Sequence, residues 1–183
     1  MNRRELLKTV PALALAPLPG PVAEEKVGNK ARLRSAICAY SYREELKKGS
    51  LTYADLVRIA VETGADGLDL TVYWMPENPG DDLLLPLRRL AYKNAVEIYS
   101  IAIRSDMCRP TPELQEAEVA QVRKWVEVAA RLGAGHIRVF GGRVPKGFTE
   151  EQAAGFAAEI LKRSADYSGS RGIVLGLENH GGI

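Results

Sequence analysis

The segment Glu178-Asn179-His180 carries the most chemically suggestive side chains of this sequence, and it directly follows an apolar run over residues 173–177. A short apolar run rich in branched residues predicts a buried strand, and two glycines at 181–182 end it. Successive side chains of a strand alternate between its faces, so Glu178 and His180 are predicted to point the same way. A carboxylate and an imidazole would then enter the same space, as in α/β enzymes that place their chemistry at strand ends.

Two interpretations are open for each of these residues. A charge at the end of an apolar strand has to be paired or bound to a metal. Glu178 is therefore either a metal ligand or the partner of an arginine such as Arg138. His180 either reaches substrate or metal, or forms a hydrogen bond with the following loop. Asp69 and Arg138 lie in the middle of other predicted strands and are candidates for a buried polar pair.

Other candidate binding residues follow the second and fourth predicted strands. Tyr73 and Trp74 would form an apolar wall against a sugar ring, unless they pack in the core or at its rim. Arg143 and Lys146 would meet an anionic substrate, unless they are solvated loop charges. His136 begins its strand, at the end where barrel residues stabilise the fold, and is interpreted as structural.

Five predicted strands alternate with helices along the chain. The strands cover residues 35–42, 67–74, 95–103 and 136–140, and the fifth begins at residue 173. One helix is predicted from about Leu83 to Tyr92. Capping residues mark the starts of three others: Thr52 with Asp55, Thr111 before Pro112, and Thr149 with Gln152. This alternation predicts a parallel sheet with crossover helices.

Two architectures satisfy that pattern, a doubly wound sheet and a (β/α)₈ barrel. Neither a G-x-G-x-x-G after a strand nor a G-x-x-x-x-G-K-[ST] occurs, so the phosphate-binding signals of doubly wound folds are missing. Polar and aromatic residues gather instead after several strands, as at a barrel mouth: Tyr42, Tyr73, Trp74, Arg104, Arg143, Glu178 and His180. Eight strands at this spacing need about 250 residues. We therefore expect a TIM (β/α)₈ barrel that is present only as its first five strands.

Composition excludes several classes of function. The 25 basic residues are interspersed with 23 acidic ones, and a net charge of +2 gives no indication of nucleic-acid binding. No apolar run reaches the roughly 18 residues that a membrane span needs. Two cysteines, neither in a C-x-x-C, do not form a disulfide framework.

The N-terminus has a different character from the rest of the chain. Two arginines at positions 3 and 4, followed by Glu5, a leucine pair and Lys8, resemble a twin-arginine export signal. A mildly apolar stretch with a small-residue cleavage site follows. We expect residues 1–23 to be an export signal and linker, residues 24–183 to form the partial barrel, and the protein to reach the periplasm.

Two segments resemble one known family. Residues 133–142, Gly-Ala-Gly-His-Ile-Arg-Val-Phe-Gly-Gly, are similar to the fourth-strand region of the sugar phosphate isomerase/epimerase family, and residues 174–180 to its fifth-strand signature. This is the xylose-isomerase-like TIM barrel superfamily, and the resemblance covers roughly Ser35 to Ile183. It implies a divalent-metal-dependent isomerase or epimerase of a sugar or sugar phosphate. An endonuclease IV-like phosphodiesterase and a catalytically incompetent barrel fragment remain as alternatives.

The resemblance implies specific roles for the candidate residues. Glu178 would bind the metal (Mn²⁺, Mg²⁺, Co²⁺ or Zn²⁺) and act as an acid/base carboxylate, while the other ligands, usually an aspartate, a histidine and a second glutamate, would lie beyond Ile183. The substrate would contact His180, Arg143, Trp74 and Tyr73. With three strands missing, the 183-residue chain is expected to aggregate or to form a homo-oligomer.

Overall fold

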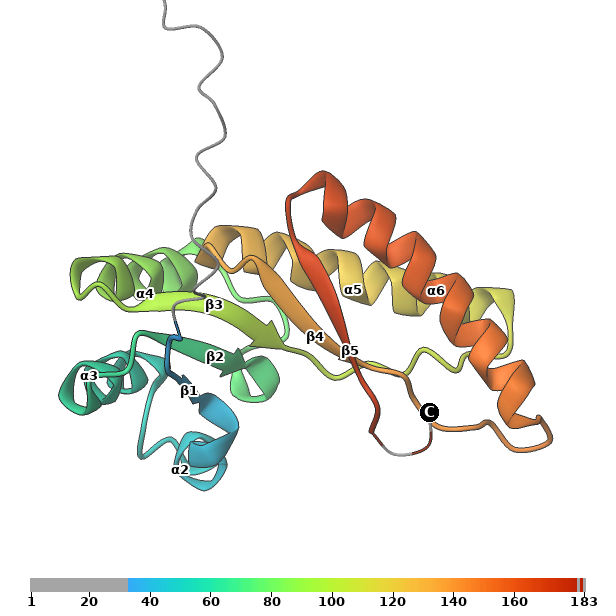
Figure 1. Ribbon diagram of the computed structural model, residues 1–183, viewed down its shortest axis with the longest axis horizontal. Coiled ribbons are helices and arrows are strands. Elements are labelled where there is room, and N and C mark those ends of the chain that lie inside the picture. Colours follow the sequence, from blue (N-terminus) through green and yellow to red (C-terminus); the bar gives the residue numbers. More distant parts are fainter. Residues whose placement is uncertain (1–32, 181, 183) are drawn as a thin grey trace, which may run out of the picture. The chain divides into compact units, whose positions relative to one another are not determined.

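The computed structural model describes residues 33–180 and residue 182, and these contain five parallel strands alternating with helices (Figure 1). The strands are β1 (Ala36–Cys38), β2 (Gly67–Thr71), β3 (Glu97–Ala102), β4 (His136–Phe140) and β5 (Val174–Glu178). Each pairs with the next one in sequence, so the sheet order is β1-β2-β3-β4-β5. This order confirms the prediction of part of a TIM barrel, because strands of a doubly wound sheet do not run in sequence order.

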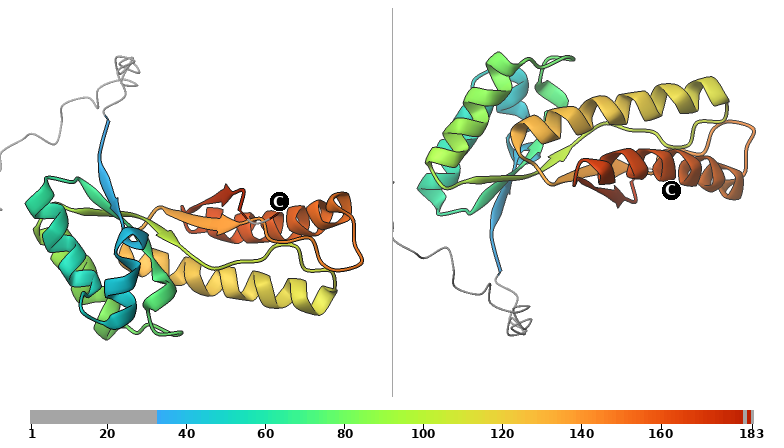
Figure 2. Two further views of the ribbon diagram at one scale, coloured as in Figure 1. Left: turned by 90° about the horizontal axis from the view of Figure 1, so that it is seen from below. Right: turned by 90° about the horizontal axis from the view of Figure 1, so that it is seen from above.

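The helices lie between successive strands, and the four longer ones pack on one face of the sheet (Figure 2), whereas the short α2 contacts the 3-10 helix that follows β1. They are α2 (Arg43–Lys48), α3 (Tyr53–Thr63), α4 (Asp81–Lys93), α5 (Pro112–Leu132) and α6 (Glu150–Ser170). On that face the strand residues form the core with the helices, as shown by Leu68, Leu70, Ile137 and Val139, each 0% exposed. The alternate residues Asp69, His136 and Arg138 point to the opposite face, which no helix of the described chain covers.

The predicted capping residues start three of these helices. Thr52 and Asp55 form a capping box at α3, and Thr149 and Gln152 form another at α6. The Thr111 hydroxyl accepts from the Leu114 N–H ahead of α5. The helix predicted over 83–92 is longer, running from Asp81 to Lys93, and holds Pro86 in its second turn. None of the helices described is long and apolar enough to cross a membrane.

The first two strands are shorter than predicted. The chain leaves β1 after Cys38 into the 3-10 helix η2 (Ala39–Tyr42), and leaves β2 after Thr71 into η3 (Val72–Trp74). Aromatic residues favour strands in general, but here their rings pack against one another. The ring centroids of Tyr40 and Trp74 are 6.1 Å apart, and those of Tyr73 and Trp74 are 5.8 Å apart.

The third strand begins two residues later than predicted, at Glu97. Ala95 has a positive φ of 54° and belongs to the turn that precedes the strand. A residue with positive φ is uncommon outside turns, and it does not fit the extended backbone of a strand.

The predicted export signal falls on residues 1–32, outside the part that the structure describes, as does the start of the predicted barrel domain at residue 24. Those expectations remain sequence-based predictions.

Candidate functional site

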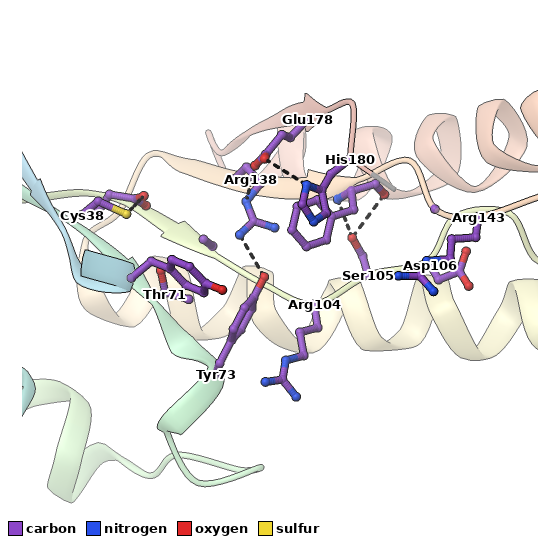
Figure 3. Close-up of a pocket in the computed structure, with 15 residues that line it drawn as sticks. Cys38, Thr71, Tyr73, Arg104, Ser105, Asp106, Arg138, Arg143, Glu178 and His180 are labelled. Carbon is purple, nitrogen blue, oxygen red and sulfur yellow. Dashed lines mark hydrogen bonds and ion pairs between the residues drawn. The ribbon is translucent and has the colours of Figure 1, made fainter. Parts of the chain in front are cut away.

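A hollow of about 620 Å³ lies at the carboxyl edge of the sheet, on the face without helices. Every strand contributes to its lining, and the loops after β3 and β4 add Arg104, Asp106 and Arg143 (Figure 3). The five carboxyl ends meet at one edge because all the strands are parallel. This volume falls in the range of small-molecule sites, about 300–1,000 Å³.

Glu178 ends β5 opposite Phe140 of β4, and its carboxylate divides its contacts between two neighbours. Its Oε2 lies 3.1 Å from the Nε of Arg138, and its Oε1 lies 3.9 Å from the Nδ1 of His180. Glu178 and His180 therefore open to the same side, as strand periodicity predicts, and both line the hollow. Both interpretations of Glu178 stay compatible with this geometry, because the ion pair to Arg138 occupies one carboxylate oxygen only.

Arg138 is fixed by contacts on several sides. Its guanidinium donates hydrogen bonds to the Tyr73 hydroxyl at 2.9 Å and to the Ile103 carbonyl at 3.0 Å. It also lies 3.8 Å from the centroid of the Phe140 ring. Because the two hydrogen bonds and the ring contact already restrict the guanidinium, little further side-chain entropy is lost when it orients the Glu178 carboxylate. Arg138 pairs with Glu178 and not with Asp69, so the proposed Asp69–Arg138 pair was wrong.

His180 is held against the β4 strand end by ring stacking. Its imidazole stacks on Phe140, with centroids 4.7 Å apart and planes 24° apart. Its side chain remains 66% exposed. The imidazole is thus oriented but accessible from the hollow, where it can meet a ligand (Figure 3).

The loop after β3 is tied down beside the hollow by a buried carboxylate. Glu118 of α5, 7% exposed, accepts from the Asp106 N–H at 3.1 Å and pairs with Arg109 at 3.1 Å. Gly142, with φ 114°, lies against this loop: a Cβ there would come within 2.2 Å of Asp106 Oδ1. Only glycine fits this position, so the loops that carry Arg104 and Arg143 are packed against each other.

His136 lies two positions before Arg138 on β4, and its imidazole contacts the neighbouring strands. Its Nδ1 is 2.8 Å from Ser100 Oγ on the neighbouring strand. Its Nε2 faces Gly176, where an added Cβ would be 2.2 Å away. The imidazole fills the space that a side chain on β5 would otherwise occupy, in agreement with its interpretation as structural.

The structure brings four of the five predicted site residues together. Tyr73, Arg143, Glu178 and His180 line the same hollow. Trp74 does not; it packs against the core and lines a separate pocket with Leu46 and Leu87.

Sequence reasoning missed three residues that line the hollow from β1 and β2, namely Cys38, Thr71 and, as a site residue, Asp69. Their signal was present in the sequence. Asp69 and Thr71 are two positions apart in β2, and their spacing puts both on the inner face with period 2.

The donor atoms at β5 agree in kind with a divalent cation. Glu178 Oε1 lies on the His180 side of the carboxylate, away from the Oε2 that pairs with Arg138, and His180 offers an imidazole nitrogen there. A carboxylate and an imidazole are ligands that Mn²⁺, Co²⁺ and Zn²⁺ accept. Among residues 33–180 and 182, no cluster of three or more His, Cys, Asp or Glu side chains could hold a metal ion. Glu178 and His180 supply two donors, fewer than the three protein ligands of a typical catalytic zinc site.

Comparison with known proteins places this geometry in context. The family model described as xylose isomerase-like TIM barrel matches residues 57–182. No curated protein matches the chain. Among solved structures, D-psicose 3-epimerase from Clostridium cellulolyticum, crystallised with D-tagatose, superposes with a TM-score of 0.69 at 15% identity, over 79% of this chain and 52% of that one.

Two further structures give a similar result. A sugar phosphate isomerase/epimerase from Parabacteroides distasonis has a TM-score of 0.62 at 18% identity, over 84% of this chain and 53% of that one. The IOLI protein with a zinc atom has a TM-score of 0.65 at 13% identity, over 80% and 51%. At these identities the likeness shows the fold, and this chain spans about half the length of each of these structures. The family match covers most of the chain, and the chain belongs to the xylose isomerase-like TIM barrel family.

Proposed function

We propose that this chain carries part of the active site of a divalent-metal-dependent isomerase or epimerase that acts on a sugar or sugar phosphate. The observation that carries the proposal is the environment of Glu178. One of its carboxylate oxygens is held by Arg138 at 3.1 Å, and the other faces the hollow beside His180. The similar structures named as a D-psicose 3-epimerase and a sugar phosphate isomerase/epimerase support this reaction class.

Isomerisation and epimerisation of a sugar both begin with the loss of a proton from a carbon next to a carbonyl. The Glu178 carboxylate is the base that this chain offers. In an isomerisation it would return the proton to the neighbouring carbon, and in an epimerisation a second group, on the opposite face of the carbon, would have to deliver a proton. Arg138 would keep the carboxylate pointing into the hollow during both transfers. A divalent cation, when bound by Glu178 and further ligands, would stabilise negative charge on the substrate oxygens.

The other side chains of the hollow suit a polyhydroxylated ligand. His180 can donate or accept a hydrogen bond at a substrate hydroxyl, and it is held in place by Phe140. Tyr73 would contribute an apolar surface against a sugar ring. Arg143 has no ion pair within the described residues and would receive a phosphate group if the substrate carries one.

The proposal is tested in the protein that contains this chain, loaded with Mn²⁺, by NMR in D₂O. A panel of ketohexoses that includes D-tagatose and D-fructose, and their phosphates, would be followed for deuterium uptake at the carbon next to the carbonyl. We expect uptake with at least one member, and a loss of about 10²-fold or more in Glu178→Gln. Glu151→Gln, on the exposed start of α6, is the matched control and should react like the wild type. Uptake that survives Glu178→Gln would refute the assignment.

We also propose that the protein is exported by the twin-arginine route. The support is the sequence at residues 3–8 alone. Replacing Arg3 and Arg4 with lysine should retain the protein in the cytoplasm of a host with this pathway, and an unchanged periplasmic yield would contradict the proposal.

A further inference from the structure

Two polar atoms on the inner face of β2 are buried without a hydrogen-bond partner. They are the Oδ1 of Asp69 and the Oγ1 of Thr71. The Thr71 side chain is almost completely buried, with 1% of the residue exposed. Both residues line the hollow that also contains Glu178 (Figure 3). A buried polar group that lacks a partner costs stability, so two in adjacent inward positions require an explanation.

The neighbours of Asp69 in its own row do not satisfy it. In the sheet register Asp69 lies between Cys38 and Ser100. The Cys38 thiol donates to the other carboxylate oxygen, Oδ2, over a long 3.5 Å contact. The Ser100 hydroxyl is committed to His136 at 2.8 Å. Oδ1 is therefore left as an acceptor without a donor.

The row of Thr71 offers no partner either. Its neighbour on β3 is Ala102, whose methyl group has no polar atom, and the next residue in that row is Arg138, which is committed to the three partners described above. The Cys38 thiol lies near the Thr71 hydroxyl, but no hydrogen bond of ordinary geometry joins them. The Thr71 carbonyl accepts from Tyr53 at 2.8 Å, which fixes the backbone and leaves the hydroxyl as the unpaired group.

We propose that Asp69 and Thr71 form a second subsite of the hollow, which holds hydroxyl groups of a polyol substrate while Glu178 acts on its carbonyl end. This subsite rests on the proposed function and names the part of the substrate recognised at β2. Asp69 accepts from a hydroxyl, and Thr71 both accepts and donates, so together they match the two functions of a sugar hydroxyl. Binding would involve a rotation of either side chain about its χ angle that turns the unpaired oxygen toward the hollow.

A hydroxyl ligand fits this subsite better than a cation does. In the sheet row of Asp69, the neighbour on β1 that could ligate a metal is Cys38, whose thiol donates to Asp69 Oδ2. Asp69 and Cys38 are only two donors, and among the described residues no group of three or more His, Cys, Asp or Glu side chains could hold a metal ion. Recognition of hydroxyls through buried polar groups also gives strong selectivity, because an analogue without the hydroxyl leaves those groups unpaired.

The test uses Thr71→Val, which replaces the hydroxyl by a methyl group of nearly the same shape. Two opposite effects are expected in the Mn²⁺-loaded protein that contains this chain. Without sugar, the melting temperature should stay equal or rise, because an unpaired buried hydroxyl is removed. Affinity for D-tagatose, measured by calorimetry, should fall about 3- to 10-fold, the value of one hydrogen bond. Asp69→Asn keeps the shape, removes the charge and should weaken binding further.

Monodeoxy analogues of D-tagatose identify the hydroxyl concerned. The wild type should bind one of these analogues more weakly than D-tagatose. Thr71→Val should bind D-tagatose and that same analogue with equal affinity. Thr63→Val is the matched control: that hydroxyl donates to the Ile59 carbonyl within α3, and its loss should not change the affinity. A Thr71→Val protein that melts lower, or that discriminates between the sugars like the wild type, would overturn the subsite.

The outcomes separate this subsite from the proposed function. If sugars bind with the Thr71 dependence but no proton exchanges, the subsite stands and the isomerase assignment fails. If proton exchange depends on Glu178 but binding is indifferent to Thr71 and Asp69, the reaction stands and the subsite fails.

Discussion

The Nε of Arg138 lies 3.1 Å from the Oε2 of Glu178, and the two residues come from adjacent strands of the sheet. They differ in how strongly they are held. The Arg138 side chain is 18% exposed and makes two further hydrogen bonds, whereas the Glu178 side chain is 46% exposed. This asymmetry makes Arg138 the fixed member of the pair and Glu178 the member that can turn toward a ligand.

The asymmetry predicts different costs for removing either partner. Glu178→Gln should lower the free energy of unfolding by less than about 1 kcal/mol, because a half-exposed ion pair contributes little. Arg138→Met should lower it by about 1–3 kcal/mol, because the Ile103 carbonyl and the Tyr73 hydroxyl lose their donor as well. Urea denaturation monitored by circular dichroism measures both. Equal losses would show that Arg138 is not anchored independently of Glu178.

Gly176 faces His136 so closely that a methyl group would displace the imidazole. In Gly176→Ala the new Cβ would lie 2.2 Å from Nε2, so the ring must move and its 2.8 Å contact with Ser100 must break. We expect a loss of about 1–3 kcal/mol in the free energy of unfolding, as for other overpacked positions. Urea titration measures the loss.

Two variants test whether the clash with His136 causes the loss of stability in Gly176→Ala. Gly155 lies inside α6 with nothing within 4 Å of an added Cβ. Gly155→Ala should therefore stabilise the protein by about 0.5–1 kcal/mol. In a His136→Ala background the Gly176→Ala change should cost much less than in the wild type. An undiminished cost in that background would place the clash elsewhere.

The buried phenol of Tyr53 should make the stability of the protein depend on pH. Its hydroxyl donates to the Thr71 carbonyl at 2.8 Å. Burial raises the pKa of the phenol far above its usual value near 10. Above pH 10 the unfolded chain releases this proton while the folded chain keeps it. Stability should therefore be complete below about pH 10 and fall by about 1.4 kcal/mol per pH unit above it.

Tyr53→Phe isolates this contribution. The variant should be about 0.5–1.5 kcal/mol less stable at neutral pH, because the Thr71 carbonyl loses its donor. Its stability should also fall less steeply than that of the wild type between about pH 10 and 11 in urea titrations. Tyr92→Phe, with 84% of Tyr92 exposed, should follow the wild type at every pH. Parallel curves for the wild type and Tyr53→Phe would argue against the shift.

The sequence predicted the strand–helix order and the position of Glu178 because both depend on local signals. Apolar runs, capping residues and the period of a strand are properties of neighbouring residues, and they located β4, β5 and the starts of α3, α5 and α6. The ends of β1 and β2 were missed because the chain turns there into the 3-10 helices η2 and η3, where Tyr40 and Trp74 pack against each other. A ring contact between residues so far apart in the chain has no signature in either segment alone.

The polar contacts of the site were harder to predict for the same reason. Arg138 was a candidate partner of both Asp69 and Glu178, and the sheet register decides between them. In that register Arg138 lies opposite Ala102, not opposite a residue of the Asp69 row. The subsite at Asp69 and Thr71 was inferred because the neighbouring strands provide no hydrogen-bond partner for two of their oxygens. The sequence of one strand alone does not show which side chains of the other strands lie beside it.

The polypeptide of residues 1–183, expressed as such, should associate with itself through β5. Within the described residues β5 pairs with β4 alone, so its other edge has backbone groups open to pairing. Val174 is 64% exposed and Leu177 55%, one on each face of this edge strand. An edge strand with exposed apolar residues on both faces promotes association. Sedimentation velocity should show species larger than a monomer, and a dye that fluoresces on apolar surfaces should bind.

Charges on the strand should reverse that behaviour. Val174→Lys and Leu177→Lys together place a like charge on both faces of the edge, which opposes pairing with a second β5. The double variant should sediment closer to a monomer and bind less dye. Lysines at Leu85 and Tyr92 of α4, both exposed but distant in sequence from the sheet edge, give the matched control and should leave the association unchanged. A wild-type chain that is monomeric and melts cooperatively would contradict the prediction, because it would show that β5 needs no partner on its second edge.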